Sequence, residues 1–320
     1  MKMRSFVVAI LLAMLSSNAM AETKIVAYVP NWVDLAKFVD SIDYAKLTHI
    51  NIAFENPVDD AGTLSFSSKN DALITRAHEK RVKVLVSIGG GAASSNKPLV
   101  ARYFDLQTEA KRAGFVAKLA DYVVEHNFDG MDVDIEGPSI GKDYGAFIED
   151  LGKALKAKDK LMTAALSKGY GGDHVPDSAF KALDFVNIMA YDGTGPWDPK
   201  NAGPHSSIEF AKDNVKYWLD RGLPKSKAVL GVPFYGYGFG DSFRKRDYPY
   251  NTLLDQYPEA AEQDQVGNTI WHNSLPTIRA KAKFVVDEGL AGMMIWSLDY
   301  DIKGKNSLLT AMYETLIKKP

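Results

Sequence analysis

Short apolar runs alternate with longer segments of helical periodicity along most of the chain. Four segments place apolar residues on one helical face, at 108–127, 142–157, 207–222 and 275–289, and two of these end at a glycine suited to a helix C-terminus. Eight runs rich in β-branched and other apolar residues are predicted to be strands: 24–29, 49–54, 82–88, 130–136, 161–167, 185–191, 229–235 and 292–298. Alternating strands and helices predict a parallel sheet covered on both faces.

The number of these units favours one closed barrel. Eight strand–helix units in about 250 residues are the usual size of a (β/α)8 TIM barrel. A doubly wound open sheet is the alternative, but it needs a glycine-containing phosphate-binding turn after the first strand, and residues 29–38 contain no glycine. The stretch 236–275 holds one short helical pattern near 251–256. We therefore predict a single-domain α/β barrel with little or no insertion domain.

The N-terminal residues have a different pattern from the rest of the chain. Lys2 and Arg4 precede an apolar run at 6–15, and Ala19-Met20-Ala21 follows it. This order is typical of a secretory signal peptide, and the run is shorter than the roughly 20 apolar residues of a spanning helix. We predict a signal peptide at 1–21, a barrel domain at 22–320, and a secreted or periplasmic protein with no membrane contact after cleavage.

Composition narrows the classes of function. The chain has 38 Lys and Arg residues against 40 Asp and Glu residues, which argues against a strongly basic nucleic-acid surface. The absence of cysteine excludes disulfides, thiolate metal sites and a cysteine nucleophile. The six histidines lack the paired spacing of a zinc site, and the glycine-rich runs 89–91 and 236–240 lack the flanking features of a phosphate loop. We predict a monomer with no metal and no cofactor.

Three acidic residues alternate with apolar residues on the fourth predicted strand. Asp132, Asp134 and Glu136 share one face, and residues 131, 133 and 135 share the other. Since helices cover the outer face, the acids are expected to point into the barrel, which is normally filled by apolar side chains. An exposed edge strand conflicts with the buried character of residues 133–135. A hard-cation site would need oxygen ligands from other strands.

Like charges in a poorly solvated site repel each other and raise the pKa of at least one group, so catalysis explains this pattern best. Glu136 lies highest on the strand and is predicted to be a proton donor with a raised pKa. Asp134 is expected to share a hydrogen with Glu136 or Asp132, and Asp132 and Asp134 to titrate as a pair. A second carboxylate that faces Glu136 from another strand, as a nucleophile would, is not evident.

The acidic strand carries the pattern Asp129-Gly130-x-Asp132-x-Asp134-x-Glu136. It resembles the D-G-x-D-x-D-x-E signature of glycoside hydrolase family 18, the chitinases and related endo-N-acetyl-β-glucosaminidases. Further motifs of that family are matched by Ala53-Phe54, Ser87-Ile88-Gly89-Gly90, Met189-Ala190-Tyr191-Asp192 and Trp296. The resemblance spans the chain from Tyr28 to the last helix.

The resemblance implies a substrate-assisted reaction, in which the acetamido carbonyl oxygen of the sugar attacks the anomeric carbon. Glu136 would act as acid and then as base, Asp134 would polarise the acetamide N–H, and Asp132 would hold Asp134 and share its proton. Tyr191 would hydrogen-bond the acetamide oxygen, and Asp192 would support a distorted sugar ring. The implied substrate-binding residues are Tyr28, Phe54, Gly89, Gly90, Met189, Asp192, Trp197, Tyr235 and Trp296, the last as the apolar floor of the central subsite.

Aromatic residues supply apolar surfaces on which sugar rings stack. The candidate platforms are Trp32, Tyr144, Trp197, Tyr235, Tyr237 and Trp271, and Trp197 is favoured because it follows the sixth strand directly. The predicted substrate is chitin or its oligosaccharides, β-linked N-acetylglucosamine chains bound in a shallow cleft. Cleavage of the N-glycan chitobiose core is the alternative activity, and a non-catalytic lectin is the alternative from another class. Such lectins commonly lack the acidic Glu that is present here.

Overall fold

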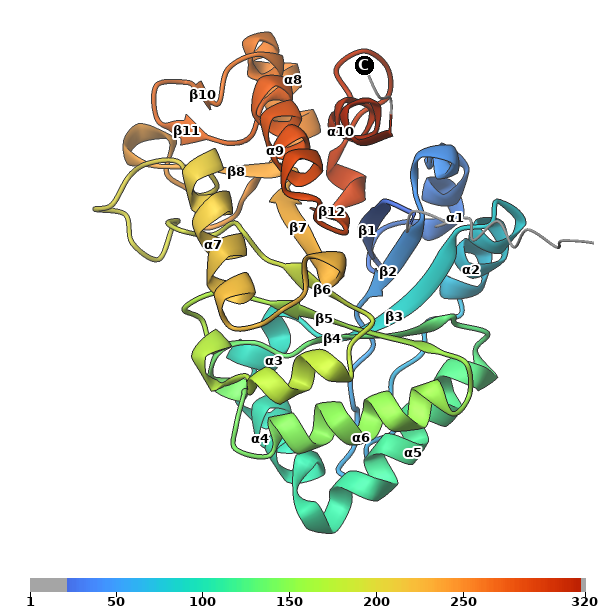
Figure 1. Cartoon of the computed structure of the whole chain (residues 1–320). Coiled ribbons are helices and arrows are strands. Elements are labelled where there is room, and N and C mark those ends of the chain that lie inside the picture. The colour runs from blue at the N-terminus through green and yellow to red at the C-terminus, as the bar shows by residue number, and fades with distance from the viewer. Residues whose placement is uncertain (1–21, 318–320) are drawn as a thin grey trace, which may run out of the picture.

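The structure, a computed structural model, describes residues 22–317 and forms a closed barrel of eight parallel strands (Figure 1). The predicted signal peptide at 1–21 lies outside the described residues. Around the barrel the strands follow the order β1-β12-β7-β6-β5-β4-β3-β2. Their bounds are β1 Lys24–Pro30, β2 His49–Ala53, β3 Lys83–Gly89, β4 Gly130–Asp134, β5 Leu161–Leu166, β6 Phe185–Ile188, β7 Ala228–Pro233 and β12 Gly292–Trp296. The predicted barrel is confirmed, with each strand within a few residues of its expected position.

Helices cover the outside of the barrel, and the four that periodicity predicts are all present. Asn96 caps α4 by accepting a hydrogen bond from the Leu99 N–H at 3.3 Å, and Ser207 caps α7 in the same way. Helix α9 ends at Gly289 with φ of 65°, a left-handed conformation that glycine adopts without strain. The helices are α1 Leu35–Phe38, α2 Asn70–Glu79, α3 Gly91–Ser95, α4 Lys97–Gln107, α5 Glu109–Glu125, α6 Tyr144–Lys156, α7 Ile208–Asp220, α8 Tyr250–Gln256, α9 Leu275–Glu288 and α10 Leu308–Ile317.

The alternation of side chains along each strand separates two apolar regions. Outward residues such as Val133 and Ile135 pack with helix residues such as Phe147 of α6 in the larger region. Inward residues such as Val26 and Met294 fill the barrel interior. The outer region therefore binds the helices to the sheet, and the inner one supports the carboxyl ends of the strands, where barrel enzymes place their chemistry.

The segment between β7 and α9 contains a small antiparallel sheet that periodicity did not predict. Its strands are β8 Tyr235–Gly238, β9 Tyr248–Pro249, β10 Gln265–Val266 and β11 Ile270–Trp271, in the order β10-β11-β8-β9. Helix α8 confirms the short helical pattern expected there. Figure 1 shows these orange elements gathered beside α9, on one side of the barrel. The strands are two to four residues long, too short for alternation to reveal.

Candidate active site

Asp132 lies in the barrel interior, where side chains from four other strands surround it. Its Oδ2 accepts hydrogen bonds from the Tyr28 hydroxyl at 2.6 Å and the Ser87 hydroxyl at 2.7 Å. Its Oδ1 accepts from the Thr163 hydroxyl at 2.5 Å and from Asn187 Nδ2 at 3.2 Å. Burial raises the pKa of Asp132, while these neutral donors favour the ionised form. The network fixes the carboxyl group in one orientation.

Asp134, the last residue of β4, has a different environment. Its side chain is 4% exposed, and its Oδ1 is buried without a hydrogen-bond partner in the described structure. Burial, followed by the charges of Glu136 and Asp132, raises the pKa of Asp134 well above its ordinary value. No hydrogen bond joins Asp134 to either neighbour among the described residues, so the expected sharing of a hydrogen is absent here. An orphaned buried acceptor is rare and is suited to a ligand donor.

Glu136 lies just beyond the end of β4, not within the strand as the sequence predicts. The strand stops because the chain turns at Gly137–Ser139, where Gly137 has φ of 56°. The half-buried Glu136 carboxyl lines a cavity of about 680 Å³. Desolvation is the main cause that raises its pKa to about 7, and the charge of Asp192 adds to it. Glu136 is therefore a carboxyl group able to carry a proton near neutral pH.

The loop after β6 contributes a second carboxyl group to the cavity that Glu136 lines. Asp192 lines the same cavity, has φ of 62°, and its Oδ1 accepts a hydrogen bond from the Tyr235 hydroxyl at 2.5 Å. The Tyr191 ring packs edge-on against Tyr235 with 6.2 Å between ring centroids. Burial and the nearby carboxylates raise the pKa of Tyr191 well above its ordinary value, so its hydroxyl stays protonated. Asp192, which the resemblance implies as a support for the sugar ring, thus lies in the same cavity as Glu136.

Aromatic rings gather at the ends of β1, β2 and β12. Phe54 stacks on Trp296 with 5.7 Å between the ring centroids and 20° between the ring planes. The ring centroids of Tyr28 and Trp296 are 5.4 Å apart. A Cβ at Gly90 would lie 2.3 Å from the Phe54 ring, and one at Gly89 would lie 2.1 Å from the Asp134 carbonyl oxygen. Both glycines are needed because the chain packs so closely around Asp134 and Phe54.

Some of the predicted site residues line the cavity and others lie behind it. Five of the predicted site residues line the cavity: Glu136, Met189, Tyr191, Asp192 and Trp197. Tyr28 and Tyr235 lie behind the cavity, buried to 1% and 3% exposure, and donate hydrogen bonds to Asp132 and Asp192. They are placed to support the carboxylates and not to form the cavity wall.

The candidate platforms also differ in exposure. Trp32 and Trp197 are 65% and 60% exposed, and Trp197 packs edge-on against Tyr237 at 5.4 Å. The expectation for Tyr144 is wrong, because this first residue of α6 is 1% exposed and its ring is packed in the core. A buried ring offers no face to a sugar.

Three supporting residues were missed from the sequence. Thr163 and Asn187 donate to Asp132 from β5 and β6, and their polar character at inward strand positions is a usable indication. His205 is buried, and its Nδ1 accepts a hydrogen bond from the Asp192 backbone N–H at 3.3 Å. His205 lies in a loop, 13 residues after Asp192, and loops have no periodic pattern. Its contact with Asp192 is therefore evident only from the structure.

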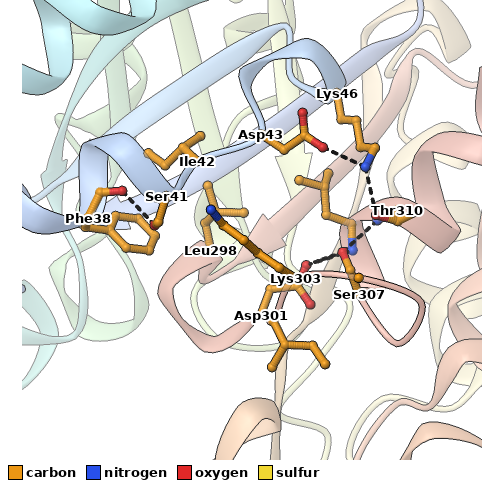
Figure 2. A pocket seen from close by; sticks show the side chains of 13 residues that line it. Phe38, Ser41, Ile42, Asp43, Lys46, Leu298, Asp301, Lys303, Ser307 and Thr310 are labelled. Atoms are coloured by element: carbon orange, nitrogen blue, oxygen red, sulfur yellow. Dashed lines mark hydrogen bonds and ion pairs between the residues drawn. The ribbon is translucent and has the colours of Figure 1, made fainter.

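A second hollow, of about 460 Å³, lies between residues 38–46 and residues 298–310 (Figure 2). Lys46 pairs there with Asp43 at 2.6 Å and donates to the Thr310 hydroxyl at 2.9 Å. Asp301 accepts from the Ser307 hydroxyl at 2.9 Å and from backbone N–H groups of α10. These polar groups satisfy one another, and the hollow shares no lining residue with the cavity at Glu136.

Within residues 22–317, no helix is long and apolar enough to cross a membrane. Within the same range, no group of three His, Asp or Glu side chains is arranged to hold a metal ion.

Comparison with known proteins agrees with this geometry. Residues 24–301 match the family model of the glycosyl hydrolases family 18. The chain is 35% identical to the GH18 chitinase ChiB of Flavobacterium johnsoniae, with a TM-score of 0.85 over 92% of this chain and 94% of that one. It is 31% identical to a class V chitinase of Arabidopsis thaliana, over 74% of this chain and 68% of the relative. It is 29% identical to a chitinase-like effector of Moniliophthora roreri, over 77% of this chain and 66% of the relative. The chain belongs to the glycosyl hydrolases family 18.

Proposed function

We propose that this chain hydrolyses the β-1,4 linkages between N-acetylglucosamine units of chitin or chitin oligosaccharides. The observation that carries the proposal is the order of the three carboxyl groups. Asp132 is held by four donors, Asp134 has a free buried acceptor, and Glu136 lines the cavity with a pKa of about 7. The chitinases among the similar proteins support the same substrate class.

The proposed reaction uses the substrate's own acetamide as the nucleophile. Protonated Glu136 gives its proton to the glycosidic oxygen as that bond breaks, and the acetamide carbonyl oxygen bonds to the anomeric carbon. Asp134 accepts the acetamide N–H and so orients the carbonyl and stabilises the positive charge that forms. Glu136 then takes a proton from the water that attacks the anomeric carbon, and the bond between that carbon and the acetamide oxygen breaks, which restores the acid and the acetamide and releases the product.

The neighbouring residues have supporting roles in this proposal. Tyr191, kept protonated, donates to the acetamide oxygen, and Asp192 holds the sugar in a distorted ring. Asp132 acts as the fixed charge beneath Asp134. Trp296, stacked on Phe54, forms the apolar floor. The protein would act outside the cytoplasm as a monomer after removal of residues 1–21. N-terminal sequencing of the exported protein tests the cleavage, since the first residue should be Glu22.

Two other activities are compatible with the same site. Cleavage of the N-glycan chitobiose core would use the same three carboxyl groups. Incubation with chitotetraose and, separately, with an N-glycosylated protein distinguishes the two, because the proposal predicts cleavage of the tetramer. Release of intact glycans with chitotetraose untouched would contradict it. A lectin would bind oligomers without turnover, and the chitinase-like effector among the relatives makes that comparison necessary.

The pH dependence follows from the pKa of Glu136. The donor must be protonated, so kcat/KM on chitin oligomers should fall as the pH rises through about 7, the raised pKa of Glu136. The need for a protonated donor fixes the direction of the change, and the raised pKa places the fall near pH 7 instead of near the pKa of an ordinary glutamate. Initial rates measured between pH 4 and 10 test this. A rate that increases steadily across that range would exclude Glu136 as the donor.

Trp197 should contribute substrate affinity and not chemistry. Its exposed ring lies on the cavity wall, so Trp197→Ala is expected to raise KM for chitin pentaose about 5-fold, the loss of one aromatic stacking contact, with kcat nearly unchanged. The control is Phe104→Ala, which removes an exposed ring on α4 that lies outside the cavity. Equal KM values for the wild type and Trp197→Ala would remove Trp197 from the binding site.

A further inference from the structure

A lysine on α9 is completely buried beside the loop that carries Asp192. The Lys281 side chain is 0% exposed, and its Nζ donates to the Ser206 carbonyl oxygen at 2.7 Å, the Ser206 hydroxyl at 2.7 Å and Asn273 Oδ1 at 2.6 Å. All three acceptors are neutral. Burial lowers the pKa of Lys281 to about 7, and the negative charges of Asp264 and Glu209 oppose this change. Neither carboxylate forms an ion pair with Lys281 in the described structure. A buried cation without a carboxylate partner costs stability, so its position calls for an explanation.

The three hydrogen bonds fasten the base of the loop 192–206. The Ser206 hydroxyl donates in turn to the Ala190 carbonyl oxygen at 2.6 Å, and Asn273 Nδ2 donates to the Ser206 carbonyl oxygen at 2.9 Å. The neighbouring His205 accepts from the Gly193 N–H at 2.9 Å through its carbonyl and from the Asp192 N–H through Nδ1. Lys281 thus holds Ser206, and the adjacent His205 binds the Asp192 backbone.

The position of Asp192 affects Glu136 directly. Both carboxyl groups line the cavity, and after burial the charge of Asp192 is what raises the pKa of Glu136. Other ionisable groups near Glu136 are Asp134, Tyr191, Tyr170 and Lys168, and Lys168 is paired with Asp213. Movement of the loop would therefore change the proton affinity of Glu136 while the strand that carries Asp134 stays in place.

We propose that Lys281 is a positioning residue of the active site, which fastens the loop 192–206 so that the Asp192 carboxylate stays beside Glu136. The catalytic consequence of this role rests on the proposed function. Its effect on the titration of the Glu136 carboxyl can be measured without turnover. Lys281 reaches this effect through Ser206, His205 and Asp192 and has no contact with the cavity.

The test is Lys281→Met, which keeps an unbranched side chain and removes the donors and the charge. The upper pH midpoint of kcat/KM on chitin pentaose should fall by roughly half a unit, in the same direction as for Asp192→Asn, because Glu136 loses part of a like-charge interaction. Adding Lys281→Met to Asp192→Asn should give no further shift. The control is Lys283→Met on the same helix, whose exposed side chain pairs only with Asp287 and should leave the midpoint unchanged.

A folded Lys281→Met protein with the wild-type midpoint, or shifts that add fully in the double variant, would overturn the proposal. If Lys281→Met does not fold, Asn273→Ala removes one acceptor of Lys281 and one donor to Ser206, and it should give a smaller shift of the same sign. A ¹³C NMR titration of the Glu136 carboxyl, assigned with Glu136→Gln, measures the midpoint without substrate. Absence of wild-type turnover would contradict the proposed function alone. An NMR midpoint of Glu136 that is unchanged in both Lys281→Met and Asn273→Ala would contradict the role of Lys281.

Discussion

Replacing Glu136 with Gln is expected to lower kcat on chitin pentaose by about 10³-fold or more while the dissociation constant changes little. Gln has nearly the same shape but carries no transferable proton, and general acid catalysis contributes roughly 10²–10⁴-fold. Glu136 is half-buried on the cavity wall with a pKa of about 7, so the proposed reaction assigns it the proton transfer to the glycosidic oxygen. Steady-state rates and calorimetric binding of the same oligomer measure the two effects separately.

The matched control for this variant is Glu109→Gln, at the exposed start of α5. It should retain wild-type rates, since it makes the same chemical change away from the cavity. Substantial turnover by Glu136→Gln would show that another group donates the proton. Negligible turnover by both the wild type and Glu136→Gln, with binding retained, would identify a lectin.

Replacing Asp134 with Asn is expected to lower kcat by roughly 10²-fold or more without loss of stability. The Asp134 carboxyl is buried with an orphaned acceptor, and burial and the charges of Glu136 and Asp132 raise its pKa strongly, so a neutral amide at this position avoids the cost of ionising a buried group beside Asp132 and Glu136. The oriented negative charge that would bind the acetamide N–H is lost at the same time. Rates on chitin pentaose and thermal unfolding of the same preparation give both results.

Asp132→Asn provides the contrast, because this variant should lose stability where Asp134→Asn does not. Asp132 accepts four hydrogen bonds, and an amide nitrogen in place of one oxygen would face two donors. We expect a loss of about 1–3 kcal/mol in the free energy of unfolding, the cost of leaving buried polar groups unpaired. If Asp134→Asn proved the less stable of the two, or remained fully active, the different roles assigned to these carboxyl groups would be wrong.

The barrel could be predicted from the sequence because its elements leave strong periodic patterns. The strand around Val133 is apolar on the helix side, and α6 and α9 show clear apolar faces, so element type and order follow from local pattern. The small sheet β8–β11 could not be predicted in this way. Its two- to four-residue strands are held by pairing across a long segment, as between Trp271 and Tyr237, and such contacts leave no local period.

The acidic part of the site was also visible in the sequence, since three carboxylates on one inward face are costly unless they function. Their separate environments were not visible. The four donors on Asp132 come from strands far apart in sequence, and Asp192 shares a cavity with Glu136 only because the fold brings the segment after β6 to the end of β4. Tyr144 shows the reverse error, since an aromatic residue near the motif is part of the core.

The most direct test of the central claim compares chitin pentaose with the same pentamer lacking its N-acetyl groups, with the products followed by ¹H NMR. Attack by the acetamide oxygen and then by water retains configuration, so we expect initial β-anomeric products from the acetylated pentamer and no cleavage of the deacetylated one. Equal cleavage of both pentamers, or initial α-anomeric products, would contradict substrate-assisted hydrolysis and point instead to Asp192 as a nucleophile or base.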